Sequence, residues 1–137
     1  MRRWLFCILG VLLIQATFGQ GNIIWPESSN DIVTGSNATI GIQFSVFENI
    51  TVEGYDSVPV GAQIGVFYSD GVNNYTCGGF EQWTGESIAI AAHGDDPFTN
   101  ITDGFVSGQP YTWFLRINNS EDPLDGWTDY MGENIVM

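Results

Sequence analysis

The chain has 137 residues and a formal net charge of −13 at pH 7, with three basic residues against 16 acidic ones. Residues 20–137 keep all 16 acidic residues but only Arg116 of the basic ones, a net charge of −15 in a stretch long enough for one domain and one core. Such a surface repels nucleic acid and anionic lipid, so we exclude both as partners.

The first 19 residues have the pattern of a secretory signal peptide. Arg2 and Arg3 precede an apolar run at 5–14, which at ten residues is too short to span a bilayer. Small residues, Thr17 and Gly19, precede a cut ahead of Gln20. We therefore expect residues 1–19 to be removed, and the mature protein to be secreted to the extracellular space without a membrane anchor.

Residues 20–38 are predicted to be an N-terminal extension. Its apolar tip, Ile23, Ile24 and Trp25, is followed by Pro26 and a polar run at 27–31. Two interpretations stay open. The tip can form a strand of its own sheet, or it can be a donor strand that pairs with a neighbouring molecule.

Residues 39–137 are predicted to form one β domain with no helix of useful length. Its strands are expected where apolar and polar residues alternate or short apolar runs occur: 39–47, 49–53, 62–68, 75–77, 88–93, 111–118, 126–130 and 135–137. Turn residues separate these segments, and the strands between 62 and 93 are expected to form a meander broken at Gly78 and Gly79. The sequence predicts an all-β fold, a single antiparallel β-sandwich (Ig-like or jelly-roll-like) of about seven or eight strands.

Several short strings of the sequence form a recognisable set: Trp25, 34–39, 61–67, Cys77-Gly78-Gly79, Trp83 with Gly85, 94–97 and 103–105. Together they resemble a β-sandwich module of secreted, surface-associated Bacteroidota proteins, here as a stand-alone domain. The resemblance implies the fold and the compartment. It implies no catalytic residue.

No recognisable catalytic set occurs, and we expect no enzymatic activity. His93 is the only histidine and no nucleophile motif accompanies it. Cys7 leaves with the signal peptide, so Cys77 has no partner in the chain and is expected to be a buried thiol. A glycosidase would need a carboxylate pair, for which Glu81 and Glu86 are the candidates.

No cofactor is expected to be required, but one loop is a candidate calcium site. Asp95, Asp96 and Asp103 supply the hard oxygen ligands that calcium takes. Asp70 with Asn73 and Asn74 is a weaker candidate, and Asp-rich turns without metal are the alternative interpretation for both.

Glycosylation motifs are denser than the roughly one or two triplets that chance predicts. The N-x-[ST] acceptors are Asn37, Asn49, Asn74, Asn100 and Asn118. Ser57 lies in an Asp-Ser-Val string that resembles the O-glycosylation motif of Bacteroidota. Covalent glycans are therefore predicted partners, with an unmodified Asn- and Thr-rich β protein as the alternative. Trp83 and Trp127 lie in turn-rich segments where exposed rings could stack on sugars.

Both ends of the mature chain are apolar, with Ile23, Ile24 and Trp25 at one and Ile135, Val136 and Met137 at the other. We expect these residues to make subunit contacts. The function hypothesis is a structural subunit of an extracellular filament, a homopolymer assembled head to tail by N-terminal strand exchange. The alternative is a secreted carbohydrate-binding or adhesive module.

Overall fold

The computed structural model describes residues 21–32, 34–71, 74–121 and 126–131. The expected signal peptide, Asn73 of the weaker calcium group, and the apolar Ile135, Val136 and Met137 lie outside the described residues. The strand expected at 135–137 lies outside them as well.

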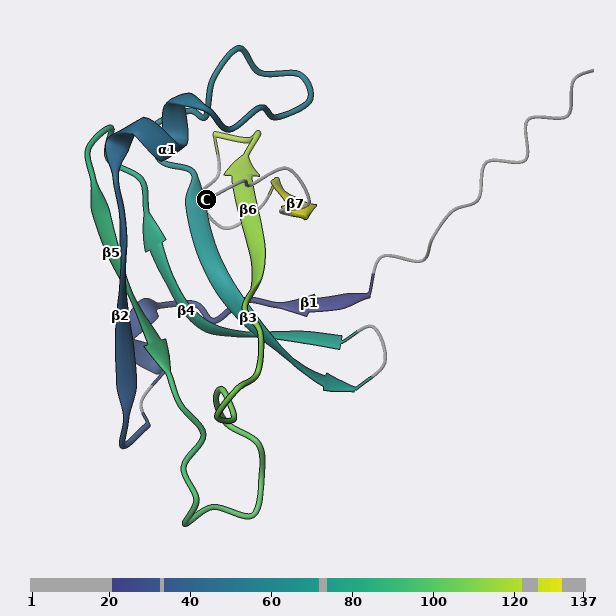
Figure 1. The fold of residues 1–137 in the computed structure, drawn as a ribbon. Helices are drawn as coiled ribbons and strands as arrows, with labels where there is room; N and C mark the ends of the chain where they lie inside the picture. Colours follow the sequence, from purple (N-terminus) through teal and green to yellow (C-terminus); the bar gives the residue numbers. More distant parts are fainter. Residues whose placement is uncertain (1–20, 33, 72–73, 122–125, 132–137) are drawn as a thin grey trace, which may run out of the picture.

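The described chain is nearly all β, with seven strands in two sheets (Figure 1). The strands are β1 Asn22–Ile24, β2 Asn37–Ile42, β3 Gln63–Gly71, β4 Asn74–Gln82, β5 Ile88–His93, β6 Thr112–Asn118 and β7 Trp127–Met131. A five-stranded sheet has the order β1-β4-β3-β6-β7, and β2 pairs with β5 in a second sheet. Only the β1–β4 pairing is parallel. The predicted all-β fold is confirmed, and the arrangement is consistent with a β-sandwich.

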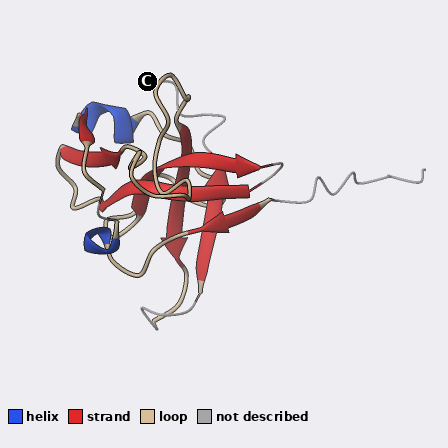
Figure 2. Ribbon diagram, turned by 90° about the horizontal axis from the view of Figure 1, so that it is seen from below, coloured by secondary structure: helices blue, strands red, loops and turns tan. Residues whose placement is uncertain are grey.

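The two sheets cross where β5 passes over β4, and strands running in two directions are visible in Figure 2. The crossing point is at Gly78 and Gly79. A Cβ on Gly79 would collide with the carbonyl of Ala91, and one on Gly78 would collide with the ring of Phe105. The expected break at these glycines is therefore wrong: β4 runs through both, because glycine leaves room for the Ala91 backbone at Gly79 and for the Phe105 ring at Gly78.

The main core lies between the two sheets. It is built from the inward residues of β2, β3, β5 and β6, with contributions from the 44–62 connection: Ile42, Phe47, Val58, Ile64, Val66, Ile90, Leu115 and Ile117 are all nearly inaccessible. Alternation along β6 places Leu115 and Ile117 in this core and leaves Phe114 and Arg116 on the opposite face. That opposite face is where the candidate site lies.

The strand expected over 39–47 ends at Ile42, and an α-helix, α1 Phe44–Glu48, follows it. The rings of Phe44 and Phe47 both stack on Trp83, with centroids 6.4 Å and 4.7 Å away. Two residues three apart reach one partner only on a helical turn, so burying Phe47 overrides the alternating pattern. Among the described residues, no helix is long and apolar enough to cross a membrane.

Two further expectations are corrected. The segment 49–53 is not a strand and contributes only an isolated bridge between Val52 and Tyr55. The meander is incomplete: β3 and β4 form the expected hairpin, but β5 pairs with β2 instead of β4. A turn at Gly85, whose φ of 92° favours glycine, carries the chain from one sheet to the other.

Candidate functional site

The five-stranded sheet has a second apolar face, and the N-terminal residues 21–32 cover it. We call residues 21–32 the arm, and we call the buried cluster beneath it the seat, formed by Phe67, Cys77, Phe80 and Phe114. Within the described chain, the apolar side chains packed on the seat are Ile23, Trp25 and Ile32 of the arm, together with Tyr75 of β4 itself. The seat is therefore shielded from water by a separate segment of the chain.

The arm is held at both of its ends. β1 runs parallel to β4, with Ile23 opposite Tyr75. A short 3-10 helix, η1 Ser29–Asp31, ends the arm and contacts β4. Ser28 caps this turn: its hydroxyl accepts from the Asn30 amide at 3.2 Å, and its own amide donates to Asp31 Oδ2 at 2.8 Å.

Trp25 makes the most varied contacts of the arm. Its ring lies edge-on to Phe67 and Phe80, with centroids 4.7 Å and 5.7 Å away. Its indole Nε1 donates a hydrogen bond of 2.8 Å to Asp129 Oδ1 on β7. The Arg116 guanidinium lies 4.3 Å from the ring centroid, within the range of a cation–π contact. Trp25 thus joins the arm to four strands, β3, β4, β6 and β7, that lie far from it in sequence.

A polar row crosses the sheet beneath Trp25. Strand register places Gln63 opposite Arg116 and Arg116 opposite Asp129. Arg116 Nε donates to Gln63 Oε1 at 2.6 Å, and the Trp127 ring covers the guanidinium from a second side at 4.6 Å. The only arginine or lysine in residues 20–137 therefore lies against two indoles.

Burial shifts the titration of both charged members of this row. It raises the pKa of Asp129, although the Trp25 hydrogen bond and the Arg116 charge act in the opposite direction. Burial also lowers the pKa of Arg116, and the Asp129 charge partly offsets this. The ionised carboxylate is thus costly here, because its partners do not fully replace water.

Cys77 is free and buried, as expected. Burial raises the pKa of its thiol to about 12, while a backbone hydrogen bond from Gly79 and the Arg116 charge act to lower it. Thiolate is the reactive form, so the closed arm leaves this thiol inert at neutral pH. Reactivity of Cys77 would report exposure of the seat.

The contacts between the arm and the seat do not involve the segment that links the arm to β2. The contacts of Ile23, Trp25 and Ile32 described above are with the five-stranded sheet, whereas residues 34–36 lead into β2 of the other sheet. Gly35 in this connection has open space around its Cα. An arm supplied by another molecule could make the same contacts.

The sequence singled out the arm tip correctly as a strand, but the structure pairs it with its own sheet. Ile23 and Trp25 point to the seat, whereas Ile24 is 45% exposed at the sheet edge. Contact of these three residues with a neighbouring molecule stays a prediction. Sequence alone did not identify the seat or the polar row, because strand register brings them together. The single arginine between Leu115 and Ile117 was the available signal.

The candidate calcium residues lie together in the 94–104 loop, where they bind the backbone. Asp103 Oδ1 accepts from the Asp96 amide and Asp95 Oδ1 from the Asp103 amide, both at 2.9 Å. The hydrogen bond from the Asp96 amide is the main cause of the lowered pKa of Asp103. Among the described residues, no three carboxylate, histidine or cysteine side chains form a group that could hold a metal ion. Calcium binding stays a prediction.

Most of the glycosylation candidates are accessible. Asn37, Asn49, Asn74, Asn100 and Ser57 are exposed. Asn118 is partly buried at the end of β6, and its side-chain oxygen accepts from the Ser120 amide at 2.8 Å. Modification at any of these positions stays a prediction.

The remaining candidates are scattered. Trp83 is only 8% exposed and its Nε1 donates to the Glu86 carbonyl at 3.0 Å, so the expectation that its ring could stack on a sugar is wrong. Trp127 is half-buried over Arg116. Glu81 lies on β4 and Glu86 in the following turn. His93 ends β5, and its Nδ1 is buried without a hydrogen-bond partner in the described chain.

The chain was compared with protein families, curated proteins and solved structures. No family, no curated protein and no solved structure matches it. The resemblance to a Bacteroidota surface module therefore stays a prediction, and functional conclusions must rest on the geometry of the chain itself.

Proposed function

We propose that the protein is a non-enzymatic structural subunit of an extracellular filament, in which the arm of one subunit occupies the seat of the next. The observation that supports this proposal is the second apolar face of the five-stranded sheet, which in the described chain is covered by the arm. A neighbour's arm can replace a subunit's own arm, because the side chains that hold it, Ile23, Trp25 and Ile32, pack on the seat of the five-stranded sheet.

Exchange of arms between subunits changes which subunit supplies each arm, and it leaves the contacts between arm and seat the same. Opening one arm exposes the seat, and burying such apolar area is worth about 25 cal/mol per Å². An open subunit therefore offers an unfilled seat and a free arm at the same time. The contact is heterologous and does not close on itself, so a chain of subunits grows. The net charge of −15 on residues 20–137 opposes lateral clumping of such chains.

Assembly of purified residues 20–137 tests the proposal. At high protein concentration, under conditions that loosen the arm, we expect filaments by negative-stain microscopy and large species by light scattering. Trp25→Ala should lower the yield of filaments strongly, because it removes the main contact between arm and seat. Ile24→Ala is the matched control, because Ile24 belongs to the arm but is 45% exposed. Its filaments should form as in the unchanged protein.

A synthetic peptide of residues 21–32 distinguishes strand exchange from other modes of assembly. The peptide fills open seats without donating an arm, so it should shorten filaments in a dose-dependent way. The same peptide with Trp25→Ala should have little effect. Exchange of the arm would be refuted by a protein that remains monomeric at every concentration. It would also be refuted by filaments whose length changes with neither peptide.

A further inference from the structure

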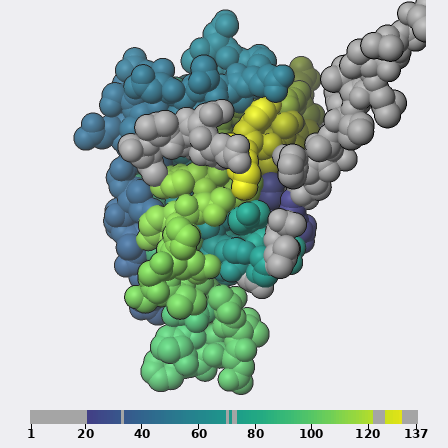
Figure 3. Space-filling view, turned by 45° about the vertical axis from the view of Figure 1, so that its right-hand side comes forward, coloured from purple at the N-terminus to yellow at the C-terminus, as the bar shows by residue number. Residues whose placement is uncertain are grey.

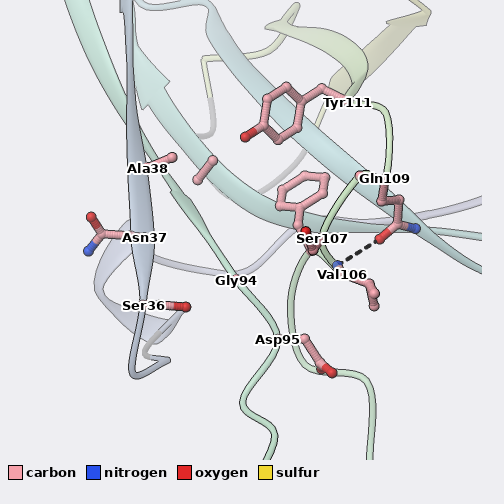
Figure 4. A pocket seen from close by; sticks show the side chains of 12 residues that line it. Ser36, Asn37, Ala38, Gly94, Asp95, Val106, Ser107, Gln109 and Tyr111 are labelled. Carbon is pink, nitrogen blue, oxygen red and sulfur yellow. Dashed lines mark hydrogen bonds between the residues drawn. The ribbon is translucent and has the colours of Figure 1, made fainter.

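A hollow of about 390 Å³ lies between the start of β2 and the connection from β5 to β6 (Figure 4). Ser36 and Ala38 lie on one side of it, with Val106, Ser107 and Tyr111 on the other. Its size is within the range of about 300–1,000 Å³ that small-molecule sites occupy. The β5–β6 connection protrudes from the body of the molecule beside it (Figure 3).

The walls of the hollow are fixed by backbone hydrogen bonds. Gly94 N donates to the Ser36 carbonyl and Phe105 N to the His93 carbonyl, both at 2.9 Å. Gln109 holds the far wall: its Oε1 accepts from Val106 N at 3.1 Å, and its Nε2 donates to the Ser69 carbonyl at 3.2 Å. A hollow held in this way needs little ordering when a ligand binds.

Aromatic rings form one side of the hollow. The ring of Phe105 packs edge-on between Tyr68 and Tyr111, with centroids 5.5 Å and 4.7 Å away. Phe105 thereby supports Tyr111 in a defined position, while Tyr111 remains 40% exposed. An exposed, supported ring presents an apolar surface with a polar hydroxyl beside it.

The polar side chains that line the hollow are three hydroxyls, one carboxylate and the amides of Asn37 and Gln109. Within the described chain, the hydroxyls of Ser36, Ser107 and Tyr111 have no hydrogen-bond partner. Asp95 also lines the hollow, and no basic residue does. Anionic ligands are thus disfavoured, and the groups present suit a ligand rich in neutral hydroxyls. The side chain of Asn37 points away from the hollow, so a glycan there would leave it open (Figure 4).

We propose that this hollow binds a neutral sugar ring, whose apolar face packs on Tyr111 and whose hydroxyls bond to the hydroxyls and the carboxylate around it. The combination of an apolar ring surface with several hydrogen-bonding groups is the chemistry that recognises an uncharged pyranose. The inference is independent of filament assembly, since the hollow and the arm share no residue. A filament built from such subunits would present one sugar site per subunit.

Titration of the monomeric protein with neutral sugars tests the site. Residues 20–137 are produced in a host that does not glycosylate and titrated with the methyl glycosides of glucose, galactose, mannose and N-acetylglucosamine, followed by NMR. At least one sugar should bind with a Kd of about a few millimolar, a free energy near −3 kcal/mol. Tyr111→Ala should weaken that binding about tenfold or more. Tyr111→Phe, which keeps the ring, should weaken it less.

The matched control is Phe98→Ala. Phe98 lies in the same connection and is 94% exposed, but it does not line the hollow. This variant should bind sugar as the unchanged protein does, and so should Trp25→Ala, which affects only the arm. Absence of binding by all four sugars at about 50 mM overturns the inference. Equal losses in Tyr111→Ala and Phe98→Ala, or no loss in Tyr111→Ala, also overturn it.

Discussion

Replacing Trp25 with alanine should open the seat, and Cys77 provides the measurement. The substitution removes two ring contacts, one cation–π contact and a hydrogen bond to a carboxylate. Ring pairs contribute about 0.5–1.5 kcal/mol each, a partly desolvated cation–π contact about 1–2, and a hydrogen bond to a charged group about 1.5–3. These contributions overlap and Trp25 is only half-buried, so we take a loss of about 3 kcal/mol.

A loss of about 3 kcal/mol corresponds to roughly a hundredfold increase in the population of the open arm. The Cys77 thiol, whose pKa of about 12 keeps it protonated while buried, reacts only after opening. Its labelling rate with a disulfide-forming reagent at pH 8 should therefore rise about a hundredfold in Trp25→Ala. Cys77 is the only cysteine in residues 20–137, so the signal has a single source.

Ile24→Ala is the control and should change the rate by no more than about threefold, because its exposed side chain costs less than about 0.5 kcal/mol to remove. The dependence of labelling on urea separates local from global opening, since a local opening exposes little surface and has a shallow slope. A Cys77 labelling rate in Trp25→Ala that stays within about threefold of the rate in the unchanged protein would show that the arm does not protect the seat from the reagent. Equal acceleration by both variants would show the same.

Three further predictions concern the sheet crossing, the acidic groups and the loop. Gly79→Ala should lower the free energy of unfolding, measured in urea titrations, by about 3 kcal/mol or more, because the added Cβ meets the Ala91 carbonyl. The control is Gly41→Ala, at a strand position with open space, which should change this free energy by no more than about 0.5 kcal/mol. Asp129 has a raised pKa, so its contribution to stability is greatest below the ordinary pKa of 3.8 and is lost as pH rises through the pKa of the folded state. Asp129→Asn should remove this fall from the dependence of the free energy of unfolding on pH. Asp103 has a lowered pKa, so the stability that its carboxylate contributes is lost as pH falls. Asp103→Asn should therefore remove a loss of stability toward low pH, the opposite of the change expected for Asp129→Asn. One carboxylate oxygen of Asp95 and one of Asp103 already accept backbone amide hydrogen bonds, so we expect millimolar calcium to shift the Tm by less than about 1 °C. A rise of several degrees that Asp103→Asn abolishes would instead establish a calcium site.

The alternation of apolar and polar residues was sufficient to predict most strands. Ile88–His93 is a strand with the expected bounds, and 111–118 differs from β6 by one residue. The helix at Phe44–Glu48 was missed because its residues alternate like a strand, and only contact with Trp83 selects the helical turn. Local pattern cannot reveal a partner that lies almost forty residues further along the chain.

The candidate site was predictable only in part. The apolar side chains of Ile23 and Trp25 indicated from the sequence alone that the arm packs against another surface. The face that the arm covers depends on which residues of β3, β4 and β6 share one side of the sheet. The register shift opposite Val66 and Phe67 leaves Gly78 of β4 out of the β3–β4 pairing and moves that assignment by one residue. The two glycines at 78 and 79 mark the irregularity in the sequence, but they do not show how the faces change.

The place of Arg116 has a consequence for resistance to proteolysis. A trypsin-like protease cuts after lysine or arginine, and residues 20–137 offer it this one site. The site lies in the middle of β6, with its side chain between Trp25 and Trp127. Digestion therefore requires the arm to leave and the strand to detach, so the folded protein should resist a whole class of digestive enzymes.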